Sequence, residues 1–184
     1  MRSSLSLSRV LRRKGLHGLM LGAVAALGLA ATPQSAAARD MVSISPNIQP
    51  GTIVISAHKR RLFLVVGTGV AISYPVAVPK RGKEWSGATA IDAKYVNPDW
   101  TPPAAVRADH PELPDVIPGG SPRNPMGVRA MTLDRGEVAI HGTTSKMRGS
   151  IGSAASYGCI RMLNEDVADL YDRVSVGSPV IMQP

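Results

Sequence analysis

Residues 52–78 read TIVISAHKRRLFLVVGTGVAISYPVAV, and this stretch decides the fold. Three runs rich in branched and aromatic side chains are separated by two short polar turns, at 58–60 and 67–69. Runs of this length and composition, bounded by charged or glycine-containing turns, are typical of β-strands joined as hairpins. We therefore expect an antiparallel meander at the start of a mostly β domain.

The rest of the chain continues this pattern and adds one helix. Further strand patterns lie at residues 87–95, 128–133, 137–142 and 178–182. Residues 164–174 (NEDVADLYDRV) have apolar side chains at helical spacing, and Asn164 is placed to cap the helix that they predict. The side chains on its apolar face are Val167, Leu170, Tyr171 and Val174.

Residues 97–127 differ in kind from the strands around them. They hold eight of the fifteen prolines. Because proline fixes φ and removes a backbone donor, we expect neither a helix nor a central strand here. Disorder and an ordered covering loop both fit this composition. Trp100 favours order, because a large apolar ring gains by docking on a core.

The first 38 residues have the order of regions found in a secretory signal peptide. Five basic residues and no acidic residue occur in this segment, and an apolar run follows from Leu19 to Ala31. Ala36-Ala37-Ala38 then offers a cleavage site. The apolar run is about 13 residues, shorter than the roughly 20 that span a bilayer. We expect a signal of the Sec type, with an uncleaved anchor as the alternative, then a linker at 39–50 and one domain at 51–184.

The charge of the chain belongs mostly to that leading segment. The whole chain carries 21 Lys and Arg against 13 Asp and Glu, a net charge of +8. Without residues 1–38 there remain 16 basic and 13 acidic residues, a net charge of +3. A strongly basic domain would have indicated nucleic acid as a partner, and this excess is too small for that. A mildly basic surface suits an anionic polymer.

The chain contains a single cysteine, Cys159, within Ser156-Tyr157-Gly158-Cys159-Ile160-Arg161-Met162. One cysteine in an exported protein cannot form an internal disulfide, so its thiol is reactive, intermolecular or buried. Gly158 allows a substrate to approach the backbone, and the amides of Tyr157, Gly158 and Cys159 could converge on a developing oxyanion. The alternative is that Cys159 is a small buried apolar side chain.

A nucleophilic thiol needs a base, and His141 is the best-placed candidate among the four histidines. His17 lies in the signal segment, His58 in a basic turn, and His110 in the proline-rich stretch. His141 instead ends an apolar strand pattern and is followed by Gly142, so a rigid element would hold it beside a loop. A structural histidine at a strand end is the alternative.

Together the two motifs resemble the signature of the L,D-transpeptidase (YkuD-type) catalytic domain. Fourteen residues lie between His141 and Ser156, and in that family a short glycine-containing loop separates the two motifs. Residues 97–103, 119–120 and 124–127 also resemble the periplasmic branch of ErfK/YbiS-like enzymes. The resemblance covers roughly residues 51–184. One departure is Tyr157, which stands where the family often has a second histidine.

This resemblance implies a β-sandwich-like catalytic domain in the periplasm, with one short helix after the cysteine motif. Family enzymes cleave the bond after the third residue of a peptidoglycan tetrapeptide stem, release D-alanine and form a thioester. The acyl group then passes to an acceptor, which is the diamino acid of another stem, the lysine of an outer-membrane lipoprotein, a free D-amino acid or water. A hydrolase on the same scaffold and an inert wall-binding module are the alternatives. The resemblance implies no metal and no other cofactor, and we expect a monomer.

The resemblance also assigns roles to the candidate site residues. Cys159 is the nucleophile and His141 its base, oriented by the backbone carbonyl of Gly142 or Thr143. Backbone groups of Tyr157, Gly158 and Gly142 would serve the oxyanion. The side chains expected to contact substrate are Arg161, Ser156, Thr143 and Trp100. For Arg161, bracing of the loop that carries Cys159 is the alternative.

Overall fold

The computed structural model describes residues 40–184, and the signal-peptide prediction lies outside this range. No helix of the described part is long and apolar enough to cross a membrane. The described elements are β1 Met41–Ser43, β2 Ile53–Ser56, β3 Arg61–Gly67, β4 Val70–Pro79, β5 Gly87–Val96, α1 Ala104–Asp109, β6 Arg129–Leu133, β7 Ala139–His141, the 3-10 helix η1 Ser145–Ser150, β8 Ala154–Ser156, β9 Ile160–Met162, α2 Asn164–Arg173 and β10 Pro179–Gln183.

The predicted meander is confirmed as β2, β3 and β4. These strands pair in antiparallel fashion, with Ile53 opposite Leu64 and Leu64 opposite Ile72. All three side chains are buried in the core, because residues directly opposite one another on neighbouring strands point to the same face of the sheet. The alternation of apolar residues in the sequence therefore fixes which face of this sheet is covered.

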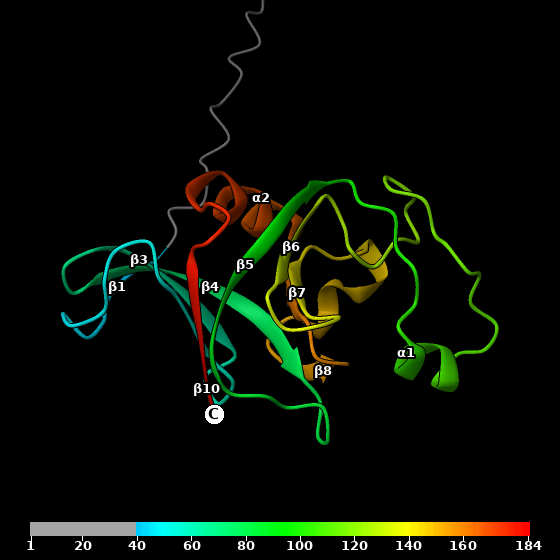
Figure 1. Cartoon of the computed structure of the whole chain (residues 1–184), viewed down its shortest axis with the longest axis horizontal. Helices are drawn as coiled ribbons and strands as arrows, with labels where there is room; N and C mark the ends of the chain where they lie inside the picture. Colours follow the sequence, from blue (N-terminus) through cyan, green and yellow to red (C-terminus); the bar gives the residue numbers. More distant parts are fainter. Residues whose placement is uncertain (1–39) are drawn as a thin grey trace, which may run out of the picture. The chain divides into compact units, whose positions relative to one another are not determined.

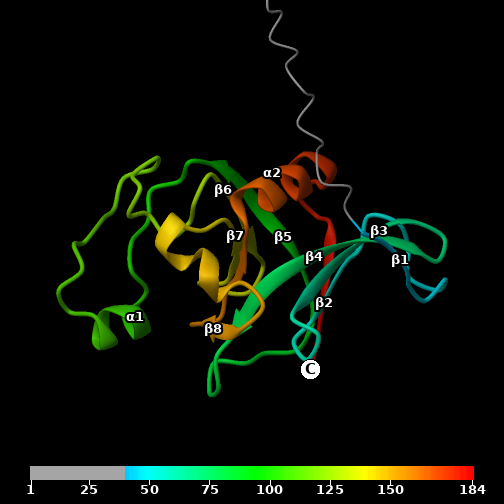
Figure 2. The ribbon, with the colours of Figure 1, turned by 180° about the vertical axis from the view of Figure 1, so that it is seen from behind.

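Two strands, β4 and β5, each belong to two sheets and join them into a sandwich-like fold. The first part of β4 pairs with β3 up to Pro75, and Val76 and Ala77 then pair with β9. In the same way β5 pairs first with β10 and then, from Ile91, with β6. Figure 2 shows β4 as a long curved strand that runs from β3 towards β8. The expectation of a mostly β fold is confirmed.

Helix α2 packs against the sheets, as its apolar face predicts. Val167 and Leu170 are fully buried, and the Tyr74 hydroxyl in β4 donates to Asp169 Oδ2 at 2.6 Å. The predicted cap is wrong, because the capping position is Leu163 and Asn164 is already the first helical residue. The side chain of Asn164 is directed instead to two neighbouring loops.

The proline-rich residues 97–127 form an ordered covering segment beside the strands (Figure 1). Trp100 and Ile117 exchange backbone hydrogen bonds of 2.9 and 2.8 Å, and the Asn124 amide donates to the carbonyls of Pro98 and Ile117. The expectation of no helix here is wrong, because residues 104–110 contain no proline and α1 begins directly after Pro103. Proline is tolerated at a helix start, where its missing N–H has no helical partner.

Part of the predicted linker at residues 39–50 is a strand. β1 pairs with β4, with Met41 opposite Ile72 and Ser43 opposite Val70. The Ile44 amide adds a bond of 3.0 Å to the Gly69 carbonyl. The sequence did not predict this strand, because three residues are too few to show an alternating pattern. The domain boundary at residue 51 stays a prediction.

Candidate active site

The pairing of β7 with β9 brings the two candidate catalytic residues to one face. The strands are parallel, with Ile140 opposite Ile160 and His141 opposite Arg161. Ile140 and Ile160 are fully buried in the core. Because side chains alternate along a strand, His141, Arg161 and Cys159 lie on the other face. The pairing of these two strands thus brings together two motifs that are separated in the sequence.

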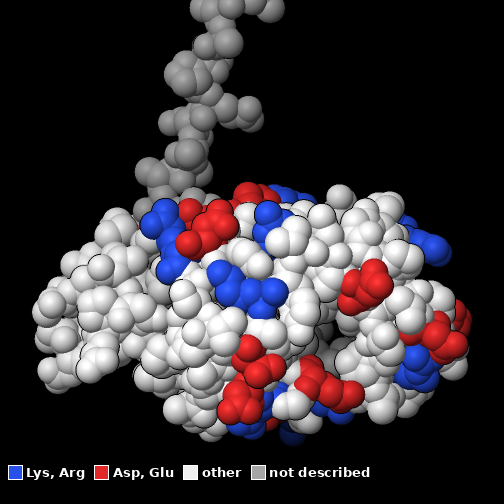
Figure 3. All heavy atoms as spheres, turned by 45° about the horizontal axis from the view of Figure 1, so that its top comes forward, with Lys and Arg blue, Asp and Glu red and all other residues white. Residues whose placement is uncertain are grey.

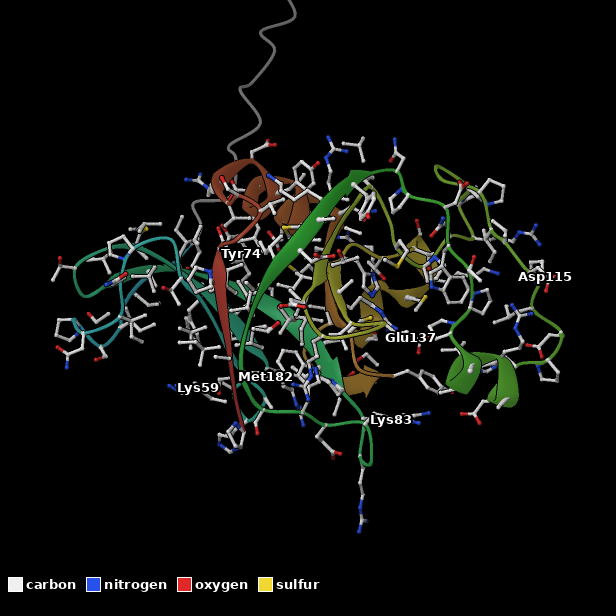
Figure 4. The ribbon with its side chains drawn as sticks, in the orientation of Figure 1. Lys59, Tyr74, Lys83, Asp115, Glu137 and Met182 are labelled. Carbon is white, nitrogen blue, oxygen red and sulfur yellow. The ribbon has the colours of Figure 1, made fainter. Side chains whose placement is uncertain are left out.

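Cys159, His141 and Arg161 line one pocket of about 110 Å³. Ser156 and Tyr157 also line it, and the covering segment contributes residues that include Trp100. A larger groove of about 690 Å³ also reaches Cys159 and shares Trp100 and Glu137 with the pocket. Figure 4 shows Glu137 near the centre of the domain, on the loop that leads into β7. Cys159 therefore lines two cavities.

The ring of His141 is oriented by the backbone of the next residue. Its Nδ1 lies 2.8 Å from the carbonyl oxygen of Gly142. A carbonyl oxygen only accepts, so Nδ1 carries the proton and Nε2 keeps its lone pair. The sequence left Gly142 and Thr143 open as the source of this carbonyl, and the structure selects Gly142. Neutral His141 can therefore act as a base through Nε2.

Burial keeps both candidate catalytic groups neutral. Desolvation, followed by the charge of Arg161, lowers the pKa of His141 to about 4, against the opposing effect of the Gly142 and Pro125 carbonyls. Burial raises the pKa of the Cys159 thiol, although the Ala139 amide and Arg161 act in the other direction. The thiol donates to the carbonyl oxygen of Glu137 at 3.7 Å. At neutral pH these pKa shifts favour a thiol at Cys159 and a neutral imidazole at His141.

The loop that carries Cys159 is braced by Ser156. The Ser156 hydroxyl donates to the Cys159 carbonyl and accepts from the Gly158 amide at 3.3 Å. Gly158 has a φ of 136°, which favours glycine. The hydroxyl of Ser156, expected to contact substrate, is engaged within the loop.

Tyr157, the departure from the family pattern, is directed to the covering segment. Its hydroxyl donates to Asp109 Oδ2 at 2.6 Å, and Lys80 Nζ lies 3.5 Å from its ring centroid. Lys80 and Asp109 form an ion pair of 3.6 Å. A histidine at this position is too short to make the same contact with Asp109, so the tyrosine ties the cysteine loop to α1.

The remaining predicted contacts with substrate separate into two groups. Trp100 and Arg161 line the pocket of Cys159. Arg161 is buried, its Nη1 donates to Ser150 Oγ at 2.8 Å, and its Nε has no partner among residues 40–184. Thr143 lines a different cavity, and its backbone N and O both bind Asn164. The structure therefore does not bring Thr143 to the thiol.

Sequence reasoning missed three groups at this site. These are the Glu137 carbonyl beside the thiol, the Asp109–Lys80 pair on Tyr157, and Asn164 behind the His141 loop. A carbonyl has no sequence signal, and the Asp109–Lys80 pair depends on how the covering segment folds. Asn164 did have a signal, a polar residue two positions after the cysteine motif, which helix capping explained equally well. Within the described part of the chain, no group of three or more His, Cys, Asp or Glu could hold a metal ion.

The lowered pKa of His141 makes the free energy of unfolding depend on pH. Between about pH 6.5 and 4 the unfolded chain binds a proton at this residue and the folded chain does not. Stability therefore falls as the pH drops through this window, by about 3 kcal/mol from this residue alone. We expect urea unfolding of His141→Gln, which cannot titrate, to show a smaller loss between pH 7 and 4. Equal losses in both proteins would show that His141 titrates normally.

Comparisons with known proteins agree with the geometry. The family model described as YkuD, L,D-transpeptidase catalytic domain, matches residues 50–182. "Probable L,D-transpeptidase YbiS" of Escherichia coli (strain K12) is 36% identical over 141 residues, which cover 72% of this chain and 44% of that protein. The chain thus spans less than half the length of such curated relatives.

Solved structures share the fold. An L,D-transpeptidase from Mycobacterium smegmatis matches with a TM-score of 0.58 at 23% identity, covering 72% of this chain and 58% of that one. A Brucella melitensis chain described as a probable carnitine operon oxidoreductase is 42% identical with a TM-score of 0.51, covering 75% of this chain and 88% of that one. With the family model matching nearly all the described residues, the chain belongs to the YkuD family of L,D-transpeptidase catalytic domains.

Proposed function

We propose that this protein is a peptidoglycan L,D-transpeptidase that uses Cys159 as nucleophile and His141 as base. The observation that carries the proposal is the placement of both residues in one pocket, on paired strands, with the Nδ1 proton of His141 held by Gly142. The relatives named L,D-transpeptidases support the same activity. A buried thiol placed only for packing would not need an oriented histidine beside it.

The proposed reaction has two halves. The Cys159 sulfur adds to the carbonyl carbon of the third residue of a tetrapeptide stem while His141 Nε2 takes the thiol proton. The C–N bond to the fourth residue then breaks and the same proton passes to the departing nitrogen, so that D-alanine leaves and the stem stays on Cys159 as a thioester. A neutral acceptor amine attacks the thioester carbon and gives a proton to His141. The C–S bond then breaks, and that proton passes to the sulfur and restores the thiol. The backbone amides of Tyr157 and Cys159 are the proposed donors to the oxyanion, because the Gly158 amide is bound to Ser156 Oγ.

The surroundings of Arg161 favour a substrate that carries a negative charge. Its guanidinium is buried in the pocket wall, its charge is uncompensated by any ion pair among the described residues, and its Nε has no hydrogen-bond partner there. A stem ending in D-alanine carries a terminal carboxylate beside the bond that is cut. We assign Arg161 to that carboxylate, because a guanidinium binds a carboxylate through charge-assisted hydrogen bonds.

The larger groove supports an amine as acceptor. Four carboxylates line it, against one guanidinium, Arg135, whose cation lies 4.8 Å from the ring centroid of Trp85. An amine of a stem diamino acid or of a lipoprotein lysine is cationic at neutral pH, so this lining would favour it. Charges of both signs are mixed on the face drawn in Figure 3, which shows no broad surface of one sign. The carboxylates are those of Asp92, Asp99, Asp134 and Glu137.

The location and assembly of the protein belong to the same proposal. The YkuD activity acts on the cell wall, so we propose export to the periplasm by a Sec-type signal at residues 1–38 and action as a monomer. Immunoblotting of periplasmic and cytoplasmic fractions, with a variant in which Leu19–Ala31 carries two arginines, tests the export. Retention of the variant in the cytoplasm is the expected result.

The test of the activity is incubation of the purified protein with disaccharide-tetrapeptide, followed by mass analysis of the products. Transpeptidation predicts cross-linked dimers, in which one D-alanine is lost for each bond formed. Disaccharide-tripeptide without dimers would instead identify a hydrolase on this scaffold. Unchanged substrate, together with binding to isolated cell walls, would identify a binding module.

A further inference from the structure

The peptide unit that joins Gly142 to Thr143 is hydrogen-bonded to the side chain of His141 on one side and to that of Asn164 on the other. The carbonyl of Gly142 accepts from His141 Nδ1 at 2.8 Å. The amide of Thr143 belongs to the same peptide unit and donates to Asn164 Oδ1 at 3.0 Å. In a trans peptide the C=O and N–H point in opposite directions. The orientation of the N–H therefore fixes the direction of the carbonyl that holds His141.

The side chain of Asn164 is itself held in one orientation. Its Nδ2 donates to the Thr143 carbonyl at 2.9 Å, while Oδ1 accepts from Thr143 and, at 3.4 Å, from Val128. The reversed amide would set two donors against each other at Thr143. All contacts of this side chain go to the loops before β6 and after β7, whereas a helix-capping asparagine would bind amides of its own helix.

Asn164 lies very close to the backbone at two glycines around this peptide. A Cβ at Gly142 would lie 2.2 Å from Asn164 Oδ1, and one at Gly127 would lie at the same distance and 2.5 Å from the Thr143 nitrogen. Gly127 also has a φ of 65°. The Gly142 amide donates to the Arg129 carbonyl at 3.1 Å, which holds the other end of the residue. Two glycines thus let Asn164 approach the backbone closely.

We propose that Asn164 is a positioning residue for His141, acting through the peptide unit between Gly142 and Thr143. This inference rests on the proposed function, because it assigns Asn164 to the same proton transfer. The hydrogen bond from Thr143 to Asn164 polarises the peptide and makes the Gly142 carbonyl a stronger acceptor. That carbonyl selects the Nδ1–H tautomer, which leaves Nε2 free for the thiol proton, and stabilises the imidazolium that forms. Asn164 thus takes the place of an orienting carboxylate, with a peptide in between.

The test is the tautomer of His141, read from the ¹⁵N shifts of its imidazole by NMR in the full protein near pH 7. The wild type is expected to show Nδ1–H alone. In Asn164→Ala the Nε2–H tautomer should become detectable, and kcat on disaccharide-tetrapeptide should fall about 10- to 100-fold with KM changed much less. Asn164→Asp keeps an acceptor for the Thr143 amide and is expected to hold the wild-type tautomer.

The matched control is Glu165→Gln, at the next position of α2. It removes the ion pair of 2.7 Å between Glu165 and Arg148 but does not touch the peptide unit. This variant is expected to keep the wild-type tautomer and kcat. An unchanged Nδ1–H tautomer in folded Asn164→Ala, or its loss in folded Asn164→Asp, would overturn the inference. Because the tautomer is measured without turnover, a wild type that lacks activity would count against the proposed function and not against this role of Asn164.

Discussion

Replacing Cys159 with alanine is expected to reduce formation of cross-linked product by at least about 1,000-fold. The substitution removes the sulfur that would form the thioester, and no other cysteine exists in the chain. The fold should be unaffected, because the side chain is only partly buried and the hydrogen bond that it donates to the Glu137 carbonyl is a weak S–H contact. The measurement is dimer formation from disaccharide-tetrapeptide at equal protein concentration.

Cys159→Ser separates the chemistry of the thiol from its shape. A hydroxyl is far less acidic than a thiol and a poorer nucleophile beside a base with a pKa of about 4, so this variant should be nearly as inactive as the alanine variant. Circular dichroism and thermal unfolding would establish that both variants fold. Turnover by either folded variant within tenfold of the wild type would place the nucleophile at another residue.

Replacing His141 with glutamine is expected to lower kcat by about 100- to 10,000-fold, the usual contribution of a general base. Glutamine keeps a hydrogen-bond donor for the Gly142 carbonyl but cannot accept the thiol proton. The thiol is neutral at rest, because burial raises the pKa of Cys159, so no preformed thiolate is present to bypass the base. The rate should recover partly at high pH, where the thiol ionises without help.

His58→Gln is the matched control for this effect. His58 is exposed in the turn between β2 and β3, far in the sequence from both motifs, and is expected to be replaceable without loss of kcat. An equal loss in both histidine variants would indicate a general effect on the protein. A His141 variant that keeps the wild-type rate across the pH range would remove this residue from the mechanism.

The parts of the fold that depend on local pattern could be predicted from the sequence. The alternating residues of 52–78 gave three strands with the expected pairing, and the spacing of Val167 and Leu170 gave the helix and its buried face. What local pattern did not show is how long strands change partners. The switch of β4 from β3 to β9 at Pro75 comes from the packing of two sheets, and it places β9 and Cys159 in the core of the site.

The candidate site likewise has parts that the sequence predicted and parts that it did not. The thiol and its histidine were identifiable from their motifs, because each requires a particular residue type. The groups that orient them are mostly backbone atoms, such as the carbonyls of Gly142 and Glu137, and any residue type supplies these. For Asn164 the sequence offered only one of two explanations. Its position at a helix start suggested a local capping role, whereas its hydrogen bonds with Thr143 and Val128 span 21 and 36 residues. Only tertiary structure distinguishes these two roles.

Cys159 is proposed to be the nucleophile that becomes acylated, in the pocket that it shares with His141. The most direct test is intact-protein mass spectrometry after incubation with a carbapenem, whose strained ring is an acyl donor. One adduct per chain is expected, located on the peptide that contains Cys159. It should be absent from Cys159→Ala and should form much more slowly in His141→Gln. An unmodified wild-type protein, or an adduct that persists in Cys159→Ala, would contradict it.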